Sequence, residues 1–124
     1  MTSVFIPVAV ADLVDKVSIL TIKAERIADD ARRANVVAEL EALQTISRGL
    51  GFDGGSVLER ELMEINVAIW DAEEGTRTCE ADGDFGDRFV KFARSVYGNN
   101  DRRAAIKRRI NIAAGSAIIE EKSY

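Results

Sequence analysis

One stripe of polar side chains in the middle of the chain has the residue types and the spacing of a binding or catalytic site. Its members recur at intervals of four and three residues, so they share one face of a helix: Asn66, Trp70, Glu73, Arg77 and Glu80. Trp70, the only tryptophan, can stack on a planar ligand or seal an interface. Glu73 is a possible general base and Arg77 a possible anion holder. The simpler alternative is that these two charges form an i, i+4 ion pair on a solvated surface.

A second candidate is the basic stretch RSVYGNNDRRAAIKRRIN at residues 94–111, which carries six Arg and Lys and a single Asp. If a helix starts within it, free backbone N–H groups together with Arg102 and Arg103 would hold a phosphate, a nucleotide or a carboxylate. Tyr97 and Asn100 lie close by in the sequence. Residues 71–87 are strongly acidic, and antiparallel helices would let the two blocks neutralise each other. Both interpretations stay open.

The composition narrows the chemistry. The chain has no histidine, so Ser-His and Cys-His catalysis and His-built metal sites are excluded. Any catalysis would rely on carboxylates, Lys, Tyr or a magnesium ion held by oxygen ligands. Glu61 and Glu64 supply the first half of the E-x-x-E and E-x-x-D pattern of helical nucleotide pyrophosphatases, but the second half is missing. We therefore predict no metal and no other cofactor.

The net charge, the apolar runs and the cysteine content indicate the class of partner and the cellular compartment. A net charge of −4 and a pI near 4.9 argue against nucleic-acid binding, because domains of that kind are usually basic. No apolar run approaches the ~20 residues of a membrane span. Cys79 has no partner for an internal disulfide, and the start of the chain lacks the basic beginning of a secretory signal. These features predict a cytoplasmic protein.

Hydrophobic spacing predicts a single all-α domain over residues 1–124. Residues 1–8 are expected to form an extended arm, and a first helix should begin near Val10. Ile19 and Ile22 fall opposite its apolar seam, so this helix should be covered on two sides, which a second subunit would explain. Asp12, Lys16 and Lys23 are expected along the solvated margin of that seam, with Asp15 and Arg26 further round on the solvated side.

Later elements follow from their capping signals. Asp29 or Asp30 should begin a second helix, and the S-x-x-E capping box at residues 56–59 a third, with Gly75 on its outer side. Asp84 should cap a short fourth helix that stops at Gly98. Residues 99–101 should start a fifth helix, which ends near residue 115. The expected fold is an antiparallel helical bundle of three longer and two shorter helices, with an extended N-terminal arm.

The last residues, GSAIIEEKSY, are too apolar for a free terminus. We expect Ile118, Ile119 and Tyr124 to dock on the bundle. The terminal carboxylate of Tyr124 should meet a nearby Arg, or lie in a site or a dimer interface.

Five segments of the chain occur together in one known family: DLVDKVSILTIKAERIAD, NVVAELEAL, EINVAIWDAEEGTR, DFGDRFVKFARSVYGNNDRRAAIKRRIN and GSAIIEEKSY. They cover most of the chain, which thereby resembles a family of small bacterial proteins catalogued only as a domain of unknown function. The resemblance implies a cytoplasmic helical protein with a loose association with surface-polysaccharide and glycosyltransferase contexts. It implies no activity and no catalytic residue. Ala9 and Ala11 depart from the family pattern, in which we expect a Ser and a Gly.

Three functions are compatible with these residues. The first is a binding or assembly module, dimeric with a second copy of itself, that recognises an anionic small molecule or a partner protein. The second is an enzyme acting on a phosphorylated or nucleotide-linked substrate, and the third is a self-associating scaffold. A pocket formed by Trp70, Glu73, Arg77 and Tyr97 would favour the first two. Salt bridges that consume the same side chains around a solid core would favour the scaffold.

Overall fold

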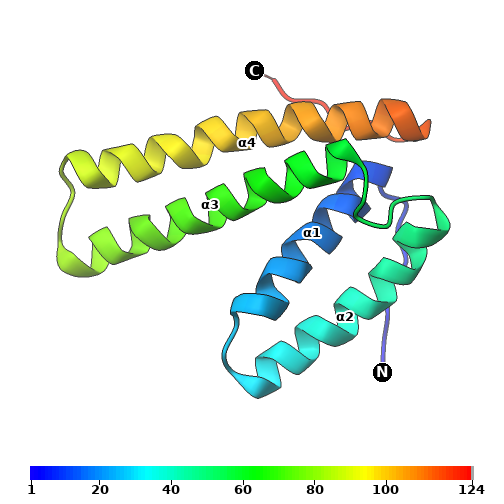
Figure 1. The fold of residues 1–124 in the computed structure, drawn as a ribbon, viewed down its shortest axis with the longest axis horizontal. Coiled ribbons are helices and arrows are strands. Elements are labelled where there is room, and N and C mark those ends of the chain that lie inside the picture. Colours follow the sequence, from blue (N-terminus) through cyan, green and yellow to red (C-terminus); the bar gives the residue numbers. More distant parts are fainter. Residues whose placement is uncertain (124) are drawn as a thin grey trace.

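The computed structural model describes residues 1–123, which form four helices and no strand: α1 (Val10–Arg26), α2 (Asp30–Gly49), α3 (Val57–Asp82) and α4 (Asp87–Ala114). We call α1 with α2 the short hairpin and α3 with α4 the long hairpin. The two hairpins cross obliquely, and α1 lies between α2 and the long hairpin (Figure 1). The all-α class is as predicted, but the helices form two crossing hairpins instead of one bundle with nearly parallel axes.

The helix α1 is covered on both sides within one chain. Ala11 and Val14 pack in the main core with residues of the long hairpin, Leu62 and Ile110 among them. Ile22 is also buried, and α2 packs along α1 on the side away from the long hairpin. The two-sided burial that the sequence indicated therefore needs no second subunit. Residues 1–8 are extended and exposed, as expected of an arm.

The loop that joins the two hairpins ends at the predicted capping box. The Ser56 hydroxyl accepts a hydrogen bond from the Glu59 N–H at 3.2 Å, and the Glu59 carboxylate accepts one from the Ser56 N–H at 3.0 Å. The other carboxylate oxygen of Glu59 accepts from the Gly54 N–H at 2.7 Å. The start of α3 is therefore held by both partners of the box, and Glu59 is buried although it is charged.

Substitution of Ser56 by alanine is expected to lower the free energy of unfolding by about 1 kcal/mol, because the Glu59 N–H loses its acceptor. A urea titration followed by circular dichroism measures the effect. The S56T variant keeps the hydroxyl and should lose little. Equal losses for alanine and threonine would show that the hydroxyl does not cap α3.

The predicted division into a fourth and a fifth helix is wrong, because α4 continues without a break from residue 87 to residue 114. Gly98 lies inside the helix, and the Asn99 side chain donates back to the Ser95 carbonyl at 2.9 Å instead of capping a new helix. Gly86, not Asp84, stands at the N-cap. Most of the length of α4 packs along α3 (Figure 1). That packing outweighs the cost of about 1 kcal/mol for a glycine inside a helix.

The two long helices pack closely against each other at Gly75. A Cβ atom at that position would lie 2.7 Å from the ring of Phe92, so Gly75 faces α4 and not the outer side as expected. Only a glycine lets the aromatic ring pack directly on the α3 backbone. Cys79 is fully buried one turn further along, with its thiol free.

Candidate functional site

A buried polar network joins α1 to the long hairpin. Asp15, Ser18 and Asn66 are each buried to within a few per cent of full coverage. The Asn66 amide donates to Asp15 Oδ1 at 2.9 Å and to Ser18 Oγ at 3.1 Å. Asn66 therefore belongs to the helix interface, although its sequence spacing placed it on an open stripe with Trp70.

Two basic residues of α4 complete this network. Arg103 Nε lies 3.5 Å from Asp15 Oδ2, and Lys107 Nζ lies 3.7 Å from the same oxygen. Lys107 also pairs with Asp12 at 2.8 Å. The buried Asp15 carboxylate is thus compensated by two cations and one amide, as a charge in the interior requires.

Lys107 carries its charge despite its partial burial. Desolvation by itself lowers the pKa of Lys107. The hydrogen bond to Asp12 and the charges of Asp15, Asp12 and Glu120 together raise the pKa by more than desolvation lowers it. The net result is a pKa above the ordinary value of a lysine. Lys107 is therefore an ammonium ion at neutral pH, surrounded by carboxylates.

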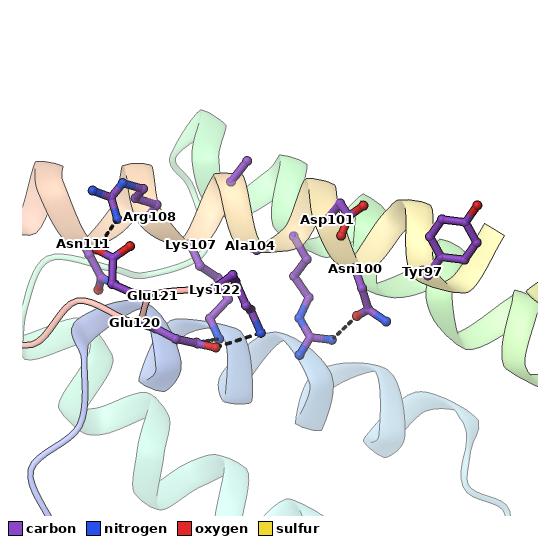
Figure 2. A pocket seen from close by; sticks show the side chains of 12 residues that line it. Tyr97, Asn100, Asp101, Ala104, Lys107, Arg108, Asn111, Glu120, Glu121 and Lys122 are labelled. Atoms are coloured by element: carbon purple, nitrogen blue, oxygen red, sulfur yellow. Dashed lines mark hydrogen bonds and ion pairs between the residues drawn. The ribbon is translucent and has the colours of Figure 1, made fainter. Parts of the chain in front are cut away.

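A groove of about 820 Å³ opens on the solvent side of this network. It runs along α4 beneath the C-terminal segment, and its lining mixes both signs of charge with two amides and one aromatic ring (Figure 2). The side chains that matter below are Tyr97, Asn100, Asp101, Arg103, Lys107 and Arg108 from α4, and Glu120 and Glu121 from the segment after it.

The C-terminal segment docks through polar contacts. Glu120 pairs with Lys107 at 3.3 Å, and Glu121 pairs with Arg108 at 2.7 Å (Figure 2). Ile118 and Ile119 keep 40% of their surface exposed, so the expected apolar docking is only partial. A hydrogen bond from Lys122 and the charge of Lys107 lower the pKa of Glu120. Tyr124, for which we expected an Arg partner, lies outside the described residues.

Three of the predicted site residues come together in the groove, namely Tyr97, Asn100 and Arg103. Arg102 does not line it, because its guanidinium turns to Asn99 Oδ1 at 3.1 Å. The expected anion site at a helix start is wrong, since these residues lie in the middle of α4, where the backbone N–H groups are already bonded.

The rest of the predicted stripe lies apart from the groove. Trp70 is half-buried and donates its indole N–H to Glu74 at 2.8 Å. Glu73 and Arg77 are exposed, and neither has an ion pair with any residue in the described range. Trp70, Glu73 and Arg77 therefore do not line the groove that contains Tyr97, and within residues 1–123 salt bridges do not consume Glu73 or Arg77 either.

Within residues 1–123, the acidic and basic blocks pair with each other only at the turn between the long helices, where Arg88 lies 3.5 Å from Asp82 and 3.4 Å from Asp84. The basic residues that α4 contributes to the groove pair with α1 or with the C-terminal segment, as described above. Sequence reasoning missed Asp15 because a charged residue was assigned to the solvated side of α1. Its position directly after Val14, one turn beyond Ala11, is the signal that places it near the core.

Fold and site together define a class of small all-helical protein, built from two crossing hairpins with a charge-lined groove at their junction. The chain belongs to a family of unknown function (DUF6165), whose model matches residues 4–124. No curated protein and no solved structure matches the chain.

Residues 1–123 contain neither a candidate membrane-spanning helix nor a candidate metal cluster. None of the four helices combines the length and the apolar character needed to cross a bilayer. The described acidic and thiol side chains include no group of three that is arranged to hold a metal ion. Glu61, one half of the E-x-x-E pair, lies 3.8 Å from Arg109.

Proposed function

We propose that this protein is a binding module whose groove takes a phosphorylated small molecule, such as a sugar phosphate or a nucleotide-linked sugar. One observation carries the proposal: carboxylates of the chain's own C-terminal segment lie on Lys107 and Arg108. These cations are therefore positioned to hold anionic groups from outside α4. A ligand phosphate would take the place of the Glu121 carboxylate at Arg108.

The energetics of that exchange favour a phosphate. The side chains of Arg108 and Glu121 are 50% and 71% exposed, so their ion pair is a surface pair worth about 0 to 1 kcal/mol. A phosphate offers more charge and a bidentate geometry to the same guanidinium. Lys107, deeper in the groove, would add a second positive charge at the phosphate once Glu120 is displaced from it as well.

The other end of the groove supplies contacts for the uncharged part of such a ligand. Tyr97 is 59% exposed, so the face of its ring is available to a sugar or a base. The Asn100 side chain lies one turn further on and accepts a hydrogen bond from Arg103 at 3.4 Å. Its amide group suits hydroxyl or base-edge recognition.

The direct test is a thermal-shift screen of the intact protein against inorganic phosphate, sugar phosphates, nucleotides and nucleotide sugars. Each is tested with and without magnesium. A ligand that binds the folded state raises the midpoint, and the stabilisation grows with the logarithm of its concentration over its dissociation constant. Midpoints that do not move with any of these compounds would contradict the proposal.

Substitution of Arg108 by alanine is expected to weaken binding of the compound identified in that screen by roughly tenfold to a hundredfold, the equivalent of losing a hydrogen bond to a charged group. Isothermal titration calorimetry measures the change. The matched control is K91A, which removes an exposed positive charge from α4 outside the groove. Equal affinities for R108A and the unchanged protein would place the ligand elsewhere.

Asp101 favours an enzyme as the second candidate function. It lines the groove, and no cation of the described chain forms an ion pair with it. An exposed carboxylate that no cation occupies is placed to accept a proton from a bound substrate. Turnover of the bound compound, followed by phosphorus NMR and lost in D101N while binding persists, would support this function.

The proposed setting is the bacterial cytoplasm. The thiol of Cys79 is free and buried in the long hairpin, which fits a reducing compartment. A phosphorylated sugar ligand would also fit the surface-polysaccharide context that the family resemblance implies. The third candidate, a self-associating scaffold, is compatible with ligand binding and depends on a different surface.

A further inference from the structure

The outer half of the long hairpin consists of two helices without a third. The short hairpin contacts it near its base, where Asp15 meets Asn66 and Arg103. The ion pair between Arg26, the last residue of α1, and Asp71 lies further along α3, at 2.5 Å. From there to the turn between α3 and α4, the hairpin projects beyond the rest of the chain (Figure 1).

One side of this projection continues the surface that α1 covers at the base. On α3, Glu73, Arg77 and Glu80 follow Asn66 at helical spacing, and Asn66 faces α1. On α4, Phe89 and Val96 lie fourteen and seven residues before Arg103, which also faces α1. We call this side the outer face and define it by Trp70, Glu73, Arg77, Glu80, Phe89 and Val96.

On the outer face, apolar side chains that are incompletely buried lie beside charged side chains that form no ion pair within residues 1–123. Trp70, Phe89 and Val96 are half-buried in the single chain. Phe85, beside this face, is 57% exposed and touches the Phe89 ring edge-on, with centroids 5.5 Å apart. Two packed helices alone cannot cover such side chains, and a third and fourth helix would do so.

The pattern of charges on this face is complementary to a second, antiparallel copy of the same pattern. The α3 stripe reads Glu73, Arg77, Glu80, and the described chain supplies no ion-pair partner for any of the three. When such a stripe is laid antiparallel on a copy of itself, Glu73 of each chain comes opposite Arg77 of the other. A two-fold axis generates both pairs at once, which is the requirement for a closed symmetric dimer.

We propose that a second copy of this chain docks on the outer face, so that two long hairpins form a four-helix arrangement around a two-fold axis. The charge complementarity of the stripe selects this occupant over an unrelated protein. The inference concerns a surface separate from the ligand groove, and it stands whether or not the groove binds a phosphate.

The size of the outer face sets the expected strength of the dimer. Residues 72–82 and 87–97 each span about 16 Å at 1.5 Å per residue. A contact of two helices over that length belongs to the small class of specific interfaces, below about 1,200 Å². We therefore expect dissociation on the order of micromolar, with the dimer populated at higher concentrations.

Charge reversal tests the pairing. E73R and R77E each place like charges opposite one another in the dimer, so each variant alone should dissociate at least about tenfold more readily than the unchanged protein. An equimolar mixture of the two should associate again, because opposite charges then meet at both pairs. The double variant E73R/R77E should associate with itself. Both positions are exposed, so folding, checked by circular dichroism, should be unaffected.

Light scattering at micromolar to millimolar concentration gives the mass of each sample. The unchanged protein should reach twice the chain mass of 13.6 kDa, and the control K91E, which reverses an exposed charge off the outer face, should match it. A mass of 13.6 kDa at every concentration would overturn the proposal. So would single variants that associate normally, or a mixture that stays monomeric. Phosphate binding by R77E reports separately on the groove, which does not contain Arg77.

Discussion

Replacement of Asp15 by alanine is expected to lower the free energy of unfolding by about 3 to 5 kcal/mol, because it removes one partner from a buried charge network. Asp15 is 5% exposed and is the only carboxylate that Arg103 contacts within residues 1–123. Its loss leaves Lys107 with carboxylates on the solvent side only, and the Asn66 amide with one acceptor fewer. Unfolding in urea or guanidinium chloride, at neutral pH, measures the difference.

Two variants separate the buried charge from its surroundings. D12A removes the other α1 carboxylate, whose side chain is 40% exposed, and should cost about 1 kcal/mol or less. D15N keeps an acceptor for Asn66 but removes the negative charge, so its loss should fall between those of D12A and D15A. If D15A and D12A destabilise the protein equally, the network does not hold α1 on the long hairpin.

Replacement of Leu62 by alanine is expected to cost about 2 to 5 kcal/mol, because the side chain is fully buried where three helices meet. Leu62 belongs to the cluster that Ala11 and Val14 of α1 form with Ile106 and Ile110 of α4. A cavity at this point loosens both hairpins together. The midpoint of thermal unfolding and the free energy of unfolding from a denaturant titration should both decrease.

The matched control for Leu62 is V57A on the same helix. Val57 lies in the first turn of α3 and is 60% exposed, so the same kind of truncation should change stability by less than about 0.5 kcal/mol. A loss for V57A as large as that for L62A would mean that the core lies elsewhere.

The elements with strong local signals were predictable from the sequence. The start of α1 at Val10, the N-cap of α2 at Asp29 and the capping box at Ser56 each appear at the expected residue. The starts of α2 and α3 are encoded within a few neighbouring residues, because a side chain caps each of them, whereas α1 has no local side-chain cap. The glycine that ends α4 is of the same kind, since Gly115 adopts the left-handed conformation with φ of 64°.

Features that depend on distant residues were not predictable in this way. The residues around Gly98 indicate a helix end. The helix nevertheless continues through Gly98, because its packing on α3 stabilises the helical conformation there. Asp15 is charged and would be expected at the surface. Its burial is compensated by Arg103 and Lys107 of α4, which lie some ninety residues away in the sequence. The α4 side of the candidate groove was predictable, because its residues lie close together in the sequence. Its opposite wall was not, because Glu120 and Glu121 come from the segment after α4.

The first helix receives its N-terminal hydrogen bonds from the far end of the chain. Ala9 provides no side-chain cap, and instead the Val10 N–H donates to Ser116 Oγ at 3.1 Å and the Ala11 N–H to Asn111 Oδ1 at 2.8 Å. During translation α1 leaves the ribosome before α4, and both acceptors are synthesised about a hundred residues after it. Until then its leading amides have only water, so the end of this helix is completed only after α4 has been made.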